Sequence, residues 1–382
     1  MISRLLEQKL KDHLKDNKAL IILGPRQVGK TTLVKSILSS LDIDAAYWNG
    51  DEADIRANFE NANSGKLKGL IGISKLLVID EAQRIQNIGL SLKLIIDQIP
   101  NVKLIATGSS SFDLANKINE PLTGRKWEFL MFPISYAEMV LHHGALEEKR
   151  RLDLRLIYGY YPDVVNQTSD PEKILKELAS SYLYKDILTW ERIQKPEKLE
   201  RLLQALALQL GNEVSYQELA QLTGMDNQTV ERYITLLEKS FIVFRLPSLN
   251  RNMRNELKKS RKIYFWDNGL RNAVINQFSP MSLRSDAGAL WENFLMVERY
   301  KHTEYHSIHC NKYFWRTHAQ QEIDYIEERN GLMQAYEFKW NPKSKQKISK
   351  VFSEHYPNSI QHLITPENFE EFVGASSNQN ID

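Results

Sequence analysis

The stretch that decides the fold is residues 20–33, Leu20-Ile-Ile-Leu-Gly24-Pro-Arg-Gln-Val-Gly29-Lys30-Thr31-Thr32-Leu33. An apolar run that predicts a buried strand leads into the pattern G-x-x-x-x-G-K-T, and the residues after it predict a helix. The two glycines allow a tight turn that brings backbone N–H groups against phosphate oxygens, and the helix N-terminus adds partial positive charge. The stretch therefore predicts a P-loop. The alternative is a strand-to-helix turn that matches the P-loop pattern in sequence only.

A P-loop at this place predicts ATP and Mg²⁺ as cofactors. Lys30 would reach the β- and γ-phosphates, and the Thr31 hydroxyl would hold Mg²⁺. The predicted nucleotide-binding residues are Gly24, Pro25, Arg26, Gln27, Val28, Gly29, Lys30, Thr31 and Thr32.

A second acidic motif follows about fifty residues later. Residues 75–83 read Lys-Leu-Leu-Val-Ile-Asp-Glu-Ala-Gln, an apolar run that ends in two carboxylates, the pattern called Walker B. Asp80 would hold Mg²⁺, and Glu81 would polarise the attacking water. The alternative is that these acids only cap the end of a strand.

Two further polar positions are candidates for contact with the γ-phosphate. A predicted strand over residues 102–107 ends at Thr107, and either Thr107 or Ser109 could serve as the residue called sensor 1. The alternative is turn chemistry around Gly108. Arg125 precedes a fifth predicted strand and is a candidate arginine finger, acting in cis or in trans, or else an ordinary surface arginine.

Several motifs along the chain resemble one family. They are Gly24-Pro-Arg-Gln-Val-Gly-Lys-Thr-Thr, Asp80-Glu-Ala-Gln-Arg, Thr107-Gly-Ser-Ser, Gly124-Arg, Phe132-Pro-Ile-Ser-Tyr-Ala-Glu, Tyr158-Gly-Tyr-Tyr-Pro-Asp, Tyr182-Leu-Tyr-Lys-Asp and Lys262-Ile-Tyr-Phe-Trp-Asp-Asn-Gly. Together they resemble the AAA-type ATPases of bacteria and archaea whose C-terminal half is a conserved domain of unknown function. The resemblance implies an α/β fold with a five-stranded parallel sheet in the order 5-1-4-3-2 and ATP as ligand.

Length and composition set broad limits. A chain of 382 residues with 42% hydrophobic and 26% charged residues fits a globular protein of two to four domains. We find no apolar run of 18 residues and expect no membrane insertion. The first residues predict an amphipathic helix, not a signal peptide, and Cys310, the single cysteine, fits a reducing compartment, so we expect a cytoplasmic protein. A net charge of +2 indicates no nucleic-acid partner by itself.

Composition and periodicity suggest five segments. We expect a P-loop ATPase core over residues 1–133, a helical lid over 134–197, a winged helix-turn-helix over 198–270, a nuclease-like α/β domain over 271–372 and a disordered tail over 373–382. Aromatic and aliphatic residues predicted to form the core of the lid are Tyr182, Tyr184, Ile187, Leu188 and Trp190.

The winged-helix prediction rests on three helices followed by two strands. Helices are expected over 199–210, from a capping box at Ser215–Glu218, and over 228–239, with strands over 241–246 and 262–266. Residues 251–262 carry six basic residues against one acidic residue, so residues 228–262 could bind the DNA backbone. The alternatives are closure over the nucleotide, a protein partner or a solvated loop.

The C-terminal segment resembles the core of PD-(D/E)xK nucleases. A helix over 288–300 carries Glu292, and strands over 322–329 and 332–340 meet at the hairpin signal Asn330-Gly331. Asp324 and Glu337 would bind Mg²⁺, with Glu292 as a third candidate ligand and Lys339 beside the attacking water. Ile323 stands where that motif has proline, and acids and lysines are common on half-exposed strands.

A zinc site is a weaker alternative in the same region. His302, His306, His309 and Cys310 have helical spacing for a metal pair, but further thiols are missing, and a polar connector is the preferred interpretation.

The sequence as a whole predicts an Mg²⁺-dependent ATPase that acts as a nucleotide-controlled switch and engages DNA. The alternatives are a regulatory ATPase that binds a protein, such as a toxin, an antitoxin or a membrane-complex client, and an Mg²⁺-dependent DNA nuclease. Oligomeric state is left open.

Overall fold

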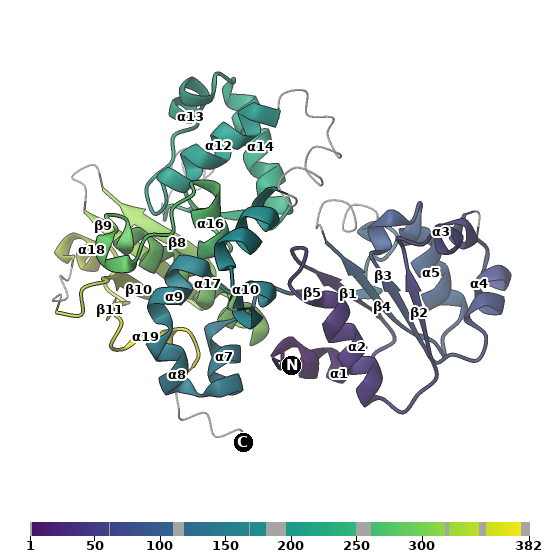
Figure 1. The fold of residues 1–382 in the computed structure, drawn as a ribbon. Coiled ribbons are helices and arrows are strands. Elements are labelled where there is room, and N and C mark those ends of the chain that lie inside the picture. Colours follow the sequence, from purple (N-terminus) through teal and green to yellow (C-terminus); the bar gives the residue numbers. More distant parts are fainter. Residues whose placement is uncertain are drawn as a thin grey trace. The chain divides into compact units, whose positions relative to one another are not determined.

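The computed structural model describes residues 2–60, 62–109, 118–167, 169–180, 196–249, 261–317, 321–343 and 349–375 (Figure 1). Contacts between residues divide the chain into two compact units. Unit 1 contains residues 1–133 and 239–241, and unit 2 contains residues 134–238 and 242–382. The finer division of unit 2 into lid, winged helix and C-terminal domain stays a prediction.

Unit 1 contains a five-stranded sheet in which every pairing is parallel. Its strands are β1 (Ala19–Leu23), β2 (Ala45–Asn49), β3 (Leu76–Asp80), β4 (Lys103–Gly108) and β5 (Lys126–Leu130). The order β2-β3-β4-β1-β5 is the predicted order 5-1-4-3-2 read from the other edge, so that prediction is confirmed. All residues of β1 and β3 are buried, because helices cover both faces of a parallel sheet.

The helices of unit 1 connect these parallel strands, since a parallel pair needs a crossover. They are α2 (Lys30–Ser40), α3 (Ala53–Phe59), α4 (Ser64–Ile71), the 3₁₀ turn η1 (Ala82–Arg84) and α5 (Ile88–Gln98), whereas α1 (Leu6–His13) precedes β1. The parallel register brings the last residues of β1, β3 and β4 to one edge of the sheet, where the P-loop begins.

Unit 2 begins with short helices, as the sequence predicts for the lid. They are α7 (Tyr136–His143), α8 (Ala145–Arg150), α9 (Leu152–Tyr158) and α10 (Pro162–Asn166), and residues 171–180 are also helical. Ser135 and Glu138 form a reciprocal capping box at the start of α7. The predicted lid core, residues 182–190, lies outside the described residues.

Three helices and a hairpin follow in the predicted order. They are α12 (Pro196–Leu208), α13 (Tyr216–Thr223), α14 (Asn227–Lys239), β6 (Val243–Pro247) and β7 (Arg261–Phe265), with β6 and β7 antiparallel. Ser215 caps α13 by accepting from the Glu218 N–H, but the Glu218 carboxylate accepts from Gln209, so half of the predicted capping box forms. Most of the basic segment, residues 250–260, lies outside the described residues.

The last part of unit 2 is a four-stranded sheet with helices. Its elements are α16 (Asn268–Val274), the 3₁₀ turn η2 (Met281–Leu283), α17 (Ala287–Tyr305), β8 (Asn311–Arg316), β9 (Glu322–Arg329), β10 (Leu332–Phe338), α18 (Lys350–His355), β11 (Ser359–Ile364) and α19 (Phe369–Phe372). The strand order is β11-β10-β9-β8, with β11 parallel to β10 and the other pairs antiparallel. Asn330 and Gly331 form the predicted hairpin turn with φ of 52° and 77°, the left-handed values a two-residue turn requires.

Two of the motifs behind the family resemblance meet inside unit 2. The buried Asp267 carboxylate accepts hydrogen bonds from the N–H groups of Tyr160 (2.7 Å) and Leu270 (2.9 Å). A Cβ at Gly159 would lie 2.1 Å from Asp267 Oδ1, and one at Gly269 would lie 2.1 Å from the Tyr158 carbonyl oxygen. These motifs therefore join α9 to α16 and have a structural role.

Among the described helices, none is both long and apolar enough to span a bilayer.

Candidate nucleotide site

The P-loop follows β1 at the carboxyl edge of the sheet of unit 1. A Cβ at Gly24 would lie 2.0 Å from the carbonyl oxygen of Met131, so only glycine fits between β1 and the end of β5. Gly29 has φ of 94°, which favours glycine, and Leu33 N–H donates to its carbonyl at 2.8 Å as α2 begins. The first N–H groups of α2 have no partner within the helix, which makes this end suitable for an anion.

The Lys30 side chain lies within the P-loop. It is 5% exposed, and its Nζ donates to the carbonyl oxygens of Gly24 (2.8 Å) and Pro25 (2.7 Å). Val28, at the top of the loop, is buried, and its carbonyl accepts from Arg4 at 2.7 Å. The P-loop thus holds the Lys30 ammonium at its centre, and the hydrogen bond from Arg4 joins the loop to the N-terminal segment.

The remaining predicted loop residues differ in exposure. Pro25 is buried, Arg26 and Thr31 are half-buried, and Gln27 and Thr32 are exposed. Gln27 has φ of 59°, so the chain turns through the left-handed region within the loop.

Asp80 is the meeting point of three hydroxyl groups. Thr31 Oγ1 donates to Asp80 Oδ2 at 2.7 Å, Thr107 Oγ1 donates to Oδ1, and Tyr47 OH donates to Oδ2. Thr31 comes from α2, Tyr47 from β2 and Thr107 from β4, so three elements converge on the end of β3. The two predicted Mg²⁺ ligands, Thr31 and Asp80, are therefore brought together.

The hydrogen bonds to Asp80 also decide its charge. Burial raises the pKa of Asp80, but the donors Thr107, Tyr47 and Thr31 outweigh burial and hold this pKa below its usual value. Conversely, burial and the neighbouring carboxylate raise the pKa of Tyr47, which keeps this hydroxyl protonated as a donor. An ionised carboxylate beside a threonine hydroxyl is an oxygen ligand set that suits Mg²⁺.

Glu81 stands next to this cluster in a constrained backbone position. Its φ is 50°, and its N–H donates to Thr107 Oγ1 at 3.2 Å. Gln83 Nε2 donates both to Glu81 Oε2 (2.5 Å) and to Ser109 Oγ (2.9 Å). Thr107 thus contacts Asp80, whereas Ser109 is linked to Glu81 through Gln83.

Sequence reasoning missed Tyr47 and Gln83. Gln83 lies two residues beyond Glu81 in the motif, which is a weak local signal. Tyr47 lies two residues before the end of β2, and only the pairing of β2 with β3 brings it near Asp80.

Arg125 is not brought to the P-loop of its own chain. It precedes β5, whose first residue pairs with Ala19 at the amino end of β1. The P-loop begins at the other end, four residues or roughly 13 Å further along the strand. Arg125 Nε instead donates to Asp97 Oδ1 at 2.7 Å. A role in cis is therefore not supported.

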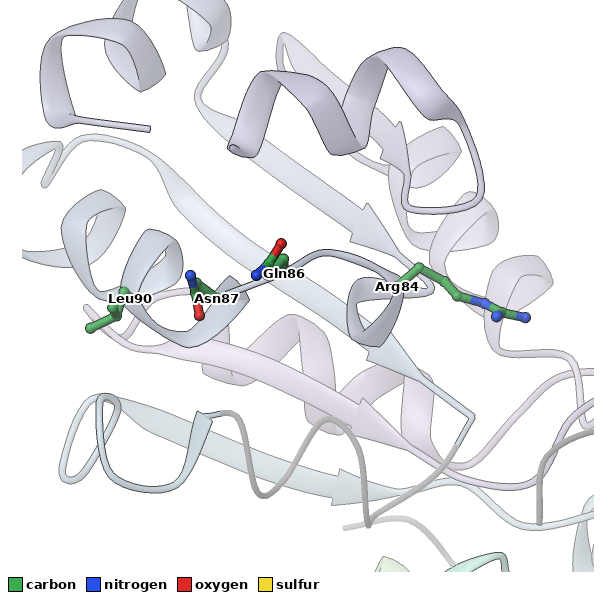
Figure 2. A pocket seen from close by; sticks show the side chains of 4 residues that line it. All are labelled: Arg84, Gln86, Asn87 and Leu90. Carbon is green, nitrogen blue, oxygen red and sulfur yellow. The ribbon is translucent and has the colours of Figure 1, made fainter. Parts of the chain in front are cut away.

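A small hollow lies on the loop that follows β3 (Figure 2). Its lining residues are Arg84, Gln86, Asn87 and Leu90. Figure 2 shows Arg84 pointing away from the other three, and its Nε pairs with Asp51 at 3.3 Å. None of the predicted nucleotide-binding residues lines this hollow.

In unit 2 the fold brings together two of the residues predicted for a second Mg²⁺ site. Glu337 is half-buried on β10, and Lys339 is exposed beyond the end of that strand. Glu292 and Asp324 instead lie with Glu322 around the ammonium of Lys262. The part of the chain that the structure describes contains no group of three His, Cys, Asp or Glu side chains that could hold a metal ion. The second Mg²⁺ site stays a prediction.

The same holds for the zinc alternative. The rings of His302, on α17, and His306, at the C-cap of α17, are tilted with centroids 4.4 Å apart, and His306 Nδ1 lies 2.9 Å from the His302 carbonyl oxygen. They form no metal-binding group with the other described residues.

Family models match three parts of the chain. Residues 16–140 match the family model described as an AAA domain. Over these residues the chain is similar to AAA domains. Residues 149–281 match a domain of unknown function (DUF8612), and residues 287–378 match another (DUF4143). The part that matches the AAA domain contains the P-loop and the Asp80 cluster.

Two relatives match most of the length of this chain. A protein of Mycobacterium tuberculosis is 25% identical over 324 residues, which cover 84% of this chain and 70% of the relative. One of Methanocaldococcus jannaschii is 23% identical over 375 residues, covering 92% and 81%. A solved Walker-type ATPase of Pyrococcus abyssi superposes with a TM-score of 0.49 at 16% identity, covering 72% of this chain and 96% of that one.

Proposed function

We propose that the AAA domain binds ATP with Mg²⁺ and hydrolyses it. The observation that carries this proposal is the contact of Thr31 with Asp80 at 2.7 Å, directly beneath a loop that holds the Lys30 ammonium. A hydroxyl and an ionised carboxylate from different elements then lie within reach of one cation, and Lys30 lies within reach of phosphate oxygens.

Each residue has a distinct part in this proposal. Lys30 exchanges the carbonyl oxygens of Gly24 and Pro25 for phosphate oxygens, and Thr31 and Asp80 hold the metal. Mg²⁺, when bound, neutralises charge on the phosphates. Glu81 accepts hydrogen bonds and orients the attacking water, while Gln83 fixes the Glu81 carboxylate against Ser109.

Nucleotide binding tests the proposal directly. Lys30→Ala should weaken the binding of a fluorescent ATP analogue by at least about tenfold, because a desolvated charge-assisted contact is worth on the order of 1.5–3 kcal/mol. Lys68→Ala, which removes an exposed lysine from α4, is the matched control and should bind like the wild type. Equal binding by the Lys30 and Lys68 variants would refute the assignment.

We further propose that the nucleotide state controls a DNA contact through residues 228–262. The support is the order of α12, α13, α14, β6 and β7, together with the basic side chains of the segment between the two strands. Lys262 has only 1% of its side chain exposed, so this lysine cannot contribute to such a contact. Arg251, Arg254, Lys258 and Lys259 are the remaining candidates outside the described residues.

DNA binding of this kind depends steeply on salt, because each neutralised phosphate releases counterions. Neutralising Arg254, Lys258 and Lys259 together should lower the affinity for duplex DNA and flatten its slope against salt. A contact that does not respond to salt, or no contact, would favour a protein partner such as a toxin, an antitoxin or a membrane-complex client. The single cysteine, Cys310, supports a cytoplasmic setting for either kind of partner, DNA or protein.

A further inference from the structure

Lys262 lies at the centre of the acid cluster in unit 2. Its Nζ is 2.9 Å from Glu292 Oε1, 2.6 Å from Glu322 Oε1 and 4.0 Å from Asp324 Oδ1. The three carboxylates come from α17 and β9, and the lysine comes from β7. Figure 1 shows α17 and β8–β11 in this C-terminal part of the chain.

The surroundings of the cluster fix the lysine in place. Its ammonium lies 5.6 Å from the centre of the Phe314 ring, and its backbone is bridged to Glu213. Tyr264 OH donates at 2.6 Å to Glu292 Oε1, the same oxygen that accepts from Lys262. That oxygen is thus already shared by two donors.

Asp324 is likewise committed to the fold. The pairing of β9 with β10 runs from Arg329↔Leu332 to Tyr325↔Tyr336, next to an irregularity in the β8–β9 register. Beyond this point Asp324 Oδ2 accepts from the Phe338 N–H at 2.8 Å and replaces a bond of the ladder. This carboxylate has one oxygen in the backbone network and one directed at the lysine.

A metal ion in the place of Lys262 Nζ would lie 2.6–4.0 Å from these carboxylate oxygens. Mg²⁺ requires oxygens at about 2.1 Å in near-octahedral order, whereas contacts of 2.6 and 2.9 Å suit an ammonium with three donors. Lys262 would have to leave a fully buried position before a metal could bind there. The residues therefore do not fit the metal that a nuclease-like core implies.

We propose that the Lys262 ammonium is the resident cation of this acid cluster, and that the cluster fastens β7 to α17 and β9 without binding a divalent metal. The hairpin β6–β7 is thereby held to the C-terminal sheet by a buried ionic contact. A buried cation surrounded by carboxylates cannot be removed without leaving charge uncompensated. This proposal is independent of the ATP site.

Manganese binding by the full chain is the test. Asp80→Asn removes the predicted metal ligand of the AAA domain. Mn²⁺ is titrated against this variant without nucleotide and followed by its EPR signal. The titration then reports metal binding by the rest of the chain. We expect this variant and its Glu292→Gln and Asp324→Asn derivatives to give the same titration. Binding that the derivatives abolish would overturn the proposal, as would Mg²⁺-dependent DNA cleavage lost on Asp324→Ala or Glu337→Ala.

Substitution of the lysine gives a second measure. Lys262→Met in the same background should lower the melting temperature by several degrees, and added Mn²⁺ should restore part of this loss. Lys262→Arg, which keeps the charge, should lose less, and Lys339→Met, the same change at an exposed lysine, should melt like the parent. Equal melting temperatures for all four chains would overturn the proposal; if the methionine variant fails to fold, the manganese titration still decides.

Discussion

Single side chains set the chemistry of the nucleotide site through a chain of hydrogen bonds. Thr31, Tyr47 and Thr107 donate to Asp80, and Gln83 links Glu81 to Ser109. These contacts leave Asp80 ionised and restrict the Glu81 side chain before any ligand arrives. Apart from Thr31, the residues that preorganise the site lie outside the G-x-x-x-x-G-K-T motif.

Gln83 should affect turnover more than binding. Gln83→Leu keeps the side-chain volume but removes both hydrogen bonds. We expect kcat to fall about tenfold or more and KM to stay nearly unchanged. This loss is a fraction of the roughly 10²–10⁴-fold rate enhancement that a positioned base contributes. Gln86→Leu changes an exposed glutamine of the same loop and should turn over ATP like the wild type. Steady-state kinetics separate the two, and a rise in KM alone would contradict this role.

His302 should make unit 2 sensitive to acid. Burial, helped by His306 and Arg299, lowers the pKa of His302 to about 4, whereas an unfolded histidine titrates near 6.5. Between these values the unfolded chain binds more protons, so stability should be complete above about pH 6.5 and fall as the pH drops towards 4. Urea unfolding at several pH values should show a smaller fall for His302→Gln than for His355→Gln, an exposed control. Equal falls would contradict this account.

Residues within a short motif could be predicted from the sequence, and residues joined by distant pairing could not. Lys30 and Asp80 stand at fixed places relative to glycines and a buried strand, so spacing predicts them. Tyr47 and Lys262 gain their partners only when β2 pairs with β3, and when β7 meets α17 and β9. The charge of Lys262 in sequence predicts a surface residue, yet three carboxylates make its burial tolerable.

At the scale of elements, the turn from β1 into the P-loop leaves no room for a side chain at Gly24. Gly24→Ala would place a Cβ 2.0 Å from a backbone oxygen of Met131, so we expect a lower melting temperature and weaker nucleotide binding. Gly69→Ala is the opposite case, because nothing lies within 4 Å of its Cβ on α4. That variant should gain roughly 0.5–1 kcal/mol from helix propensity. Thermal melts of both variants test this account, and an unchanged melting temperature for Gly24→Ala would contradict it.

Strands with a strong local pattern were predicted, and those that depend on tertiary pairing were not. The apolar runs of β1, β3 and β4 and the Asn330-Gly331 hairpin all follow from residues close in sequence. The parallel strand β11 reads Ser-Ile-Gln-His-Leu-Ile, which has no strict alternation of polar and apolar residues, and its pairing with β10 spans an intervening helix. Beside the irregularity between β8 and β9, the successive residues Tyr325, Ile326 and Glu327 are all buried, which a period of two does not predict.

For the whole molecule, the position of Arg125 limits how hydrolysis can be completed. Its pair with Asp97 lies at the end of the sheet away from the P-loop, so any contact with a γ-phosphate would be made to another copy. If the protein uses such a finger, turnover per subunit should rise with protein concentration, and Arg125→Ala should remove this rise without changing nucleotide affinity. A rate that depends on Arg125 at high dilution would contradict action in trans.

ATP hydrolysis with Glu81→Gln tests the central claim most directly. Phosphate release by the wild-type chain should require Mg²⁺, and Glu81→Gln should lower it by on the order of 10²-fold while ATP remains bound, because the amide cannot accept a proton from water. Lys30→Ala should lose both binding and release. Phosphate release at the wild-type rate by both variants would show that the site between the P-loop and Asp80 is not the site of an ATPase.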